Sequence, residues 1–150
     1  MPVNEKAAAD VGECLRQITV DVLETMFYLF PEEDVVEEVD GPWVGALFRF
    51  QGQVSGVVTV VVSEAAARTA AANFLAVEED EAAPEQAAEV VCELVNMIGG
   101  SLLGSMEHES PLEPFPPEAM EAGAFEGREA AARHVFQVEN GTLTVALYWE

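Results

Sequence analysis

Basic residues are scarce in this sequence. It contains 6 Lys and Arg residues against 28 Asp and Glu residues, which gives a formal net charge of -22 at pH 7. A surface this acidic repels nucleic-acid phosphates and anionic lipid headgroups, so direct binding to nucleic acid or to a membrane surface is not expected. The charge leaves open solubility in high salt, imitation of nucleic acid, or a partner with a cationic feature.

Cysteine and long apolar runs are also lacking. The 2 cysteines, Cys14 and Cys92, form no CxxC pair and have no histidine nearby, so neither a zinc site nor a disulfide framework is expected. No uninterrupted apolar run approaches membrane-spanning length, and the N-terminus lacks a basic segment followed by an apolar stretch. We therefore expect a cytoplasmic protein whose thiols are buried.

The chain is long enough for one domain with a substantial core. Its 150 residues are 50% hydrophobic, and no break in composition divides them, so we expect a single domain over 1–150. Apolar residues at three- and four-residue steps predict an amphipathic helix over residues 10–30, ended by Pro31. Its predicted core face consists of Val11, Cys14, Leu15, Ile18, Val22, Met26 and Leu29.

Two strands and a second helix are predicted next. Residues 43–50 and 54–62 are rich in β-branched and aromatic side chains, which indicates a hairpin whose second strand is buried on both faces. The alanine-rich residues 64–75 have high helix propensity, and Ser63 is expected to cap this helix.

A long helix and a long loop follow. Residues 77–83 form an acidic linker, and Pro84 stands where a helix prefers its first residue, so a helix is predicted over 85–106. Four prolines and two glycines between residues 111 and 127 predict a long loop with at most a short helical turn.

The C-terminal residues predict a second hairpin. Asn140 and Gly141 are expected to supply the positive φ angles of its two-residue turn. The expected cross-strand pairs are Val138 with Leu143 and Phe136 with Val145. This pairing places the four apolar side chains on one face and leaves Gln137 and Thr144 on the other. The order of elements, without a repeated parallel unit, predicts an α+β domain with helices packed on a mainly antiparallel sheet.

One face of the long predicted helix carries unusual residues. At about 100° per residue, the core face consists of Ala87, Val91, Leu94, Val95, Ile98 and Leu102. The opposite face consists of Glu89, Glu93, Asn96, Gly100 and Gly104. Asparagine is a poor helix former, and each mid-helix glycine costs roughly 1 kcal/mol relative to alanine. A docking face explains these residues, and glycines that pack against another helix are the structural alternative.

The run ELVNMIGGSLLG resembles the ExxN-containing helix of the CheC, CheX and FliY phosphatases of bacterial chemotaxis, and most closely that of the single-motif CheX-like domains. The likeness extends to the LETMF run, the strand pair before the alanine-rich helix, the ESP stretch at 109–111 and the closing hairpin. Glu89 and Ser101 differ from the fuller family motif, which tends to have Asp or Ser at the first position and Asn at the second.

This resemblance implies a function. In the family, the helix docks on a phosphorylated response-regulator receiver domain such as CheY. The resemblance implies that Glu93 pairs with the receiver's active-site lysine and that Asn96 orients the attacking water. Glu89, Gly100 and Gly104 are expected to contact the partner. The Mg²⁺ belongs to the receiver, so the chain needs no cofactor of its own, and a homodimer joined through the sheets is implied.

Two other interpretations stay open. The same face could bind a receiver or another signalling protein without catalysis, or the acidic chain could imitate nucleic acid on a basic partner. Among other candidate residues, His108 and His134 lack partners in a ligand or triad spacing. Acidic pairs such as Glu37 and Glu38 lack the spacing of a calcium loop and are expected to be solvated.

Overall fold

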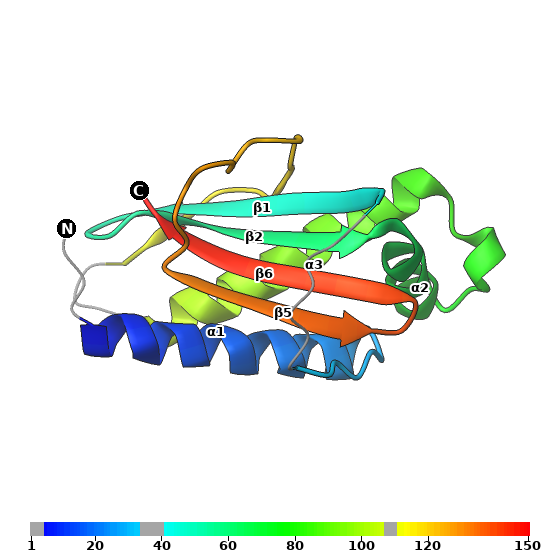
Figure 1. Ribbon diagram of the computed structural model, residues 1–150, viewed down its shortest axis with the longest axis horizontal. Coiled ribbons are helices and arrows are strands. Elements are labelled where there is room, and N and C mark those ends of the chain that lie inside the picture. The colour runs from blue at the N-terminus through cyan, green and yellow to red at the C-terminus, as the bar shows by residue number, and fades with distance from the viewer. Residues whose placement is uncertain (1–4, 34–40, 107–110) are drawn as a thin grey trace.

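The computed structural model describes residues 5–33, 41–106 and 111–150, and the side chains from residue 10 onward within them (Figure 1). In chain order the elements are α1 (Glu5–Met26), β1 (Trp43–Gln51), β2 (Gly56–Ser63), α2 (Glu64–Leu75), the 3-10 helix η1 (Glu79–Glu81), α3 (Pro84–Ser105), β3 (Glu113–Pro114), β4 (Glu118–Ala119), β5 (Ala132–Val138) and β6 (Gly141–Trp149).

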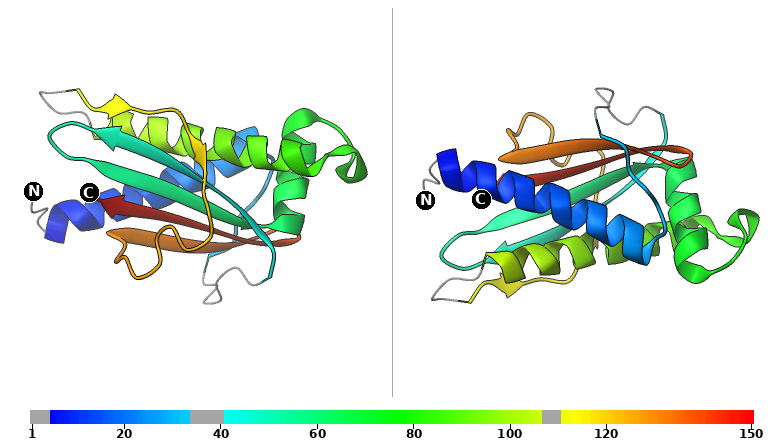
Figure 2. Two further views of the ribbon diagram at one scale, coloured as in Figure 1. Left: turned by 90° about the horizontal axis from the view of Figure 1, so that it is seen from above. Right: turned by 90° about the horizontal axis from the view of Figure 1, so that it is seen from below.

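The strands form one antiparallel sheet in the order β3-β1-β2-β6-β5, with β4 also paired to β1. The helices lie together on one face of this sheet (Figure 2). Helix α3 packs mainly against β1 and β2, whereas α1 packs against β5, and the two helices also contact each other. The predicted α+β architecture is confirmed.

The core lies between the helices and the sheet. On α1 the fully buried side chains follow a four-residue step through Leu15, Thr19 and Leu23. On α3 all six predicted core residues are buried, and they meet inward-facing strand residues such as Phe48 and Phe136. Burying a side chain of this size stabilises the fold by about 1.5–3 kcal/mol. This packing, rather than helix propensity, therefore fixes the position of α3 on the sheet.

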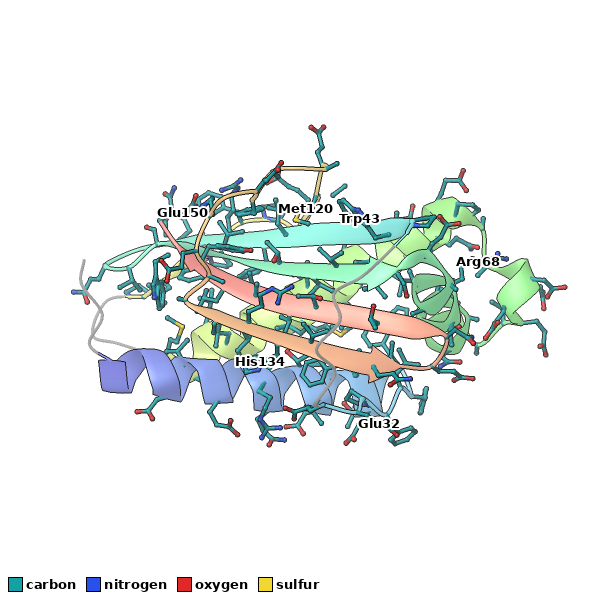
Figure 3. All side chains as sticks on the ribbon, in the orientation of Figure 1. Glu32, Trp43, Arg68, Met120, His134 and Glu150 are labelled. Carbon is teal, nitrogen blue, oxygen red and sulfur yellow. The ribbon has the colours of Figure 1, made fainter. Side chains whose placement is uncertain are left out.

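The other face of the sheet is partly covered by the proline- and glycine-rich segment. The side chain of Trp43 lies over Gly45 next to Met120, whose backbone N–H donates to the Gly45 carbonyl at 2.9 Å (Figure 3). Phe125 stacks on Tyr148 with ring centroids 4.7 Å apart. This cover explains why most of β2 is buried on both faces, as predicted, although Val61 is half-exposed.

The prediction of a loop over this segment was incomplete. Residues of β3 and β4 add two short edge strands to β1, with Phe50 opposite Pro114 and Ala46 opposite Ala119. Proline is tolerated there because an edge strand does not need every backbone N–H for the ladder.

The predicted end of the first helix was wrong. Helix α1 ends at Met26, four residues before Phe30, and Tyr28 adopts a left-handed conformation with φ of 53°. The backbone N–H of Leu29 donates to the carbonyl of Leu23 at 3.0 Å and turns the chain back. Met26, predicted to lie in the core, is instead 43% exposed.

The register of the closing hairpin was also predicted wrongly, by two residues. Phe136 pairs with Leu143 and Val138 with Gly141, so the turn consists of Glu139 and Asn140. Among the positions described, Asn140 has a positive φ of 69° and Gly141 does not. An even shift keeps each side chain on its predicted face, so the apolar face assignment is confirmed.

Glycine is needed at residue 141 because the chain passes close to Ser63 there, and not because of a turn. A Cβ at this position would overlap the hydroxyl of Ser63. That hydroxyl accepts the backbone N–H of Thr142 at 3.1 Å and makes no hydrogen bond to the start of α2. The expected side-chain cap by Ser63 is therefore wrong, because β6 uses the hydroxyl.

Candidate functional site on helix α3

The predicted docking face of α3 is exposed. The residues of this face are Glu89, Glu93, Asn96, Gly100 and Gly104, and each is exposed to solvent. The core-face residues of the same helix are at most 1% exposed. The helix is thus divided as predicted between a side held by the domain and a side left to solvent.

Glu93 and Asn96 lie close together on this face. A separation of three residues on a helix places two Cβ atoms about 5–6 Å apart. Within the described part of the chain, neither side chain makes a hydrogen bond or ion pair, and the same holds for Glu89. The Asn96 amide therefore keeps both its N–H donors and its carbonyl acceptor available.

The glycines of α3 divide into two kinds. A Cβ at Gly99 would overlap the ring of Phe48 on β1, so glycine is required there for helix-to-sheet packing. A Cβ at Gly100 or at Gly104 would meet nothing within 4 Å. Packing within the described chain therefore explains Gly99 but neither of the two glycines that share the face of Asn96.

Cys92 flanks the face, although the sequence pattern did not predict it as part of the site. The side chain is half-buried, and burial, together with the neighbouring carboxylates of Glu93 and Glu89, raises the pKa of the thiol. The position of Cys92 at the border between the polar and apolar arcs was the available signal. The expectation of a fully buried thiol was too simple here and at Cys14, which is half-buried and donates to the Ser105 hydroxyl at 3.1 Å.

The face is acidic, because Glu89 and Glu93 are exposed on it. The hollows described within residues 10–33, 41–106 and 111–150 are lined by other elements. Across residues 10–33, 41–106 and 111–150, no group of three or more His, Cys, Asp or Glu could hold a metal ion. Helix α3 is long and apolar enough to cross a membrane, but a core helix passes the same test, and its apolar side is packed against the domain.

The remaining candidate residues are accounted for separately. His134 lies on the inner side of β5, and its Nε2 is 2.8 Å from the carbonyl oxygen of Gly12 on α1. This contact gives His134 a structural role at the helix-to-sheet contact. His108, Glu37 and Glu38 lie outside the described residues, as do the first two residues of the 109–111 stretch.

The fold and this face define the class of protein, an α+β domain of the kind found in the CheC, CheX and FliY chemotaxis proteins. Within that class the chain belongs to the family described as "Chemotaxis phosphatase CheX", whose model matches residues 44–139. This range holds the whole of α3 and β2, and β1 from its second residue onward. No curated protein matches the chain closely enough to count as a relative.

Solved structures share the whole fold. CheX from Vibrio vulnificus matches with a TM-score of 0.76 and 20% identity, over 96% of this chain and 99% of that one. CheX from Desulfovibrio desulfuricans has a TM-score of 0.72 and 18% identity, over 94% of this chain and 99% of that one. A CheX from Borrelia burgdorferi, solved with CheY, BeF3 and Mg, has a TM-score of 0.66 and 18% identity, over 92% of this chain and 96% of that one.

Proposed function

We propose that this protein is a phosphatase that accelerates hydrolysis of the aspartyl phosphate on a CheY-type receiver domain. The observation that carries the proposal is the exposed pair Glu93 and Asn96 in the middle of α3 in a member of the CheX family, whose side chains make no hydrogen bond or ion pair with the residues that the structure describes. In this proposal Glu93 pairs with the receiver's active-site lysine, and Asn96 orients the attacking water.

The chemistry requires little more than positioning. An acyl phosphate is a reactive anhydride, and the receiver supplies its own Mg²⁺, so the missing part is a water held in line with the scissile P–O bond. The Asn96 amide suits this role because its carbonyl can accept a hydrogen bond from the water while its N–H donates a hydrogen bond to a phosphoryl oxygen. The water oxygen bonds to phosphorus, the bond between phosphorus and the aspartate oxygen breaks, the aspartate leaves as a carboxylate, and both protons of the water stay on the inorganic phosphate that is released.

The surroundings of the pair support a protein substrate. With no Cβ at Gly100 and Gly104, a partner's backbone can approach α3 closely beside Asn96. Glu89 lies one turn before Glu93 and completes the contact. We further propose that the chain acts in the cytoplasm as one CheX-like domain over 1–150, without a cofactor of its own, and as a homodimer joined through its sheets.

The decisive test is receiver dephosphorylation with Asn96→Ala. The rate acceleration should fall on the order of 100-fold, because the water loses its orienting group. Gln51→Ala, which removes an exposed amide at the end of β1, is the matched control and should keep full activity. Unchanged activity in a folded Asn96→Ala protein would sink the proposal.

The competing function is a binding module that docks on a receiver or another signalling protein without acting on phosphate. In that case the wild-type protein binds the phosphorylated receiver, measured by fluorescence anisotropy, while the receiver's phosphate decays equally fast with and without it.

Light scattering after size-exclusion chromatography tests the proposed homodimer.

A further inference from the structure

The large apolar side chains that the described residues expose are gathered at one corner of the molecule. They are Met26, Tyr28, Phe30, Leu75 and Val77, with exposed fractions of 43%, 64%, 71%, 38% and 39%. All five belong to two short segments, 26–30 after α1 and 75–77 after α2. We call these five residues the corner patch.

The two segments are joined side by side in the fold. Phe27 stacks on Phe74 with ring centroids 5.0 Å apart, and the Asn73 side-chain amide donates to the Phe27 carbonyl at 3.0 Å. Tyr28 follows directly with a φ of 53°, a conformation rare for a bulky residue, and its ring lies in solvent. Large apolar side chains exposed on two adjacent segments are typical of an interaction surface.

A hollow of about 300 Å³ adjoins the patch. Its lining consists of Tyr28, Phe30, Gln137 and Val138 together with the acidic residues Glu32 and Glu139. Glu32 lies beside the C-terminal end of α1, below β5 (Figure 3). Among the described residues, neither carboxylate has an ion-pair partner, whereas the neighbouring Glu33 is paired with Arg16 at 2.7 Å. The hollow thus offers apolar contact and uncompensated negative charge together.

From this arrangement we propose that the corner patch binds a segment of a second protein partner that carries large apolar side chains beside lysine or arginine. The apolar groups cover Tyr28 and Phe30, and a cationic side chain enters the hollow between Glu32 and Glu139. Charge complementarity selects this occupant, because Glu32 and Glu139, which have no ion-pair partner among the described residues, attract a cationic side chain. The patch follows the C-terminal ends of α1 and α2 and contains no residue of α3, so in this proposal its partner contacts other residues than the receiver does.

The test uses a fluorescein-labelled amphipathic peptide of leucine and lysine, with a leucine and glutamate peptide of the same pattern as the charge-reversed probe. Amide chemical-shift mapping of the intact protein should place the leucine–lysine peptide on residues 26–30, 75–77 and 137–139, and the reversed peptide should not bind. Shifts spread over the acidic surface elsewhere, or confined to α3, would overturn the proposal.

Two sets of variants test the apolar contacts and the charged contacts of the corner patch separately. Tyr28→Asn combined with Phe30→Ser should weaken peptide binding roughly tenfold or more, since buried aromatic anchors dominate such interfaces. Glu32→Gln combined with Glu139→Gln should weaken it several-fold. Glu121→Gln with Glu129→Gln makes the same charge change elsewhere and should change affinity less than about twofold. An equal loss in this control pair overturns the proposal.

Two more outcomes would contradict it. If the wild-type protein is a dimer that the Tyr28→Asn and Phe30→Ser changes convert to a monomer, the occupant is a second copy. If those changes abolish receiver dephosphorylation, the patch belongs to the receiver site. Retained dephosphorylation with lost peptide binding is the expected result, and it also keeps this test independent of the phosphatase proposal.

Discussion

Gly99 and Phe48 are in direct contact across the interface of α3 and β1, and the aromatic ring occupies the space where a side chain at residue 99 would begin. Gly100, the next residue, has no neighbour within 4 Å of its absent Cβ. Of these two adjacent glycines, Gly99 therefore faces the sheet and Gly100 faces solvent.

This difference predicts opposite effects of one methyl group. Gly99→Ala should destabilise the protein by about 1–3 kcal/mol, because the added carbon forces Phe48 to move in a packed core. Gly100→Ala should stabilise it by roughly 0.5–1 kcal/mol, because alanine has the higher helix propensity and space is open. Urea unfolding followed by circular dichroism measures both. A similar loss in the two variants would contradict the division of roles.

A larger side chain at Gly100 should hinder binding of the partner and leave the stability of the fold nearly unchanged. Gly100→Leu is expected to keep the unfolding midpoint within a small margin and to lower kcat/KM for receiver dephosphorylation on the order of tenfold, since it blocks close approach. Ala65→Leu places the same bulk at an exposed position of α2 and serves as the control. Full activity of Gly100→Leu would remove this glycine from the proposed site.

The reactivity of the Cys92 thiol should depend on the charges of Glu89 and Glu93. Burial and the charges of Glu93 and Glu89 raise its pKa, so less thiolate is present at pH 8 than in a free cysteine, and alkylation should be slow. Replacing both glutamates by glutamine removes negative charge, lowers the pKa and should speed alkylation. A Cys14→Ser background isolates the signal. If the double variant reacts no faster, the carboxylates do not act on this thiol.

The dependence on salt concentration should distinguish docking on an acidic receiver from imitation of nucleic acid. Screening weakens repulsion between two acidic proteins, so kcat/KM for the receiver should stay constant or rise as ionic strength increases from about 0.05 to 0.3 M. A nucleic-acid mimic would instead lose affinity for its basic partner steeply over the same range. A steep loss of receiver activity with salt would contradict the expected repulsion.

The closing hairpin depends on Asn140. Its positive φ of 69° suits asparagine, and its amide donates to the Thr69 hydroxyl at 2.7 Å. Asn140→Ala should lower stability by about 1–2 kcal/mol, since it loses both features. Asn140→Gly should cost less because glycine accepts the backbone conformation. Thermal unfolding of the pair measures the difference, and equal losses would assign the whole effect to the hydrogen bond.

Local patterns predicted the elements of the fold better than the contacts between them. The periodicity of α3 and the alternation in the hairpins depend on neighbouring residues, so both were predicted from the sequence. The close approach of Gly141 to Ser63 could not be predicted in this way, because Ser63 is 78 residues before Gly141 in the chain and in direct contact with it in the fold. The short strands β3 and β4 pair with the open edge of β1. The strand propensities of their own residues do not predict this pairing.

The exposed face of α3 was predicted from the sequence, because helical geometry alone separates Glu93 and Asn96 from the core residues of the helix. The distinction between Gly99 and Gly100 needed the location of Phe48, and the corner patch needed the early end of α1. Periodicity assigned Met26 to the core, but tertiary packing ends the helix there and exposes its side chain.

The packing of α3 has a consequence for how a partner is received. This helix is in contact with the sheet, with α1 and with α2, so its outer side cannot shift or rotate without disturbing the core on every other side. A rigid surface of this kind loses little conformational entropy when a partner binds. We therefore expect α3 to superpose closely in the free and bound states, with any adjustment of shape made by the receiver's loops.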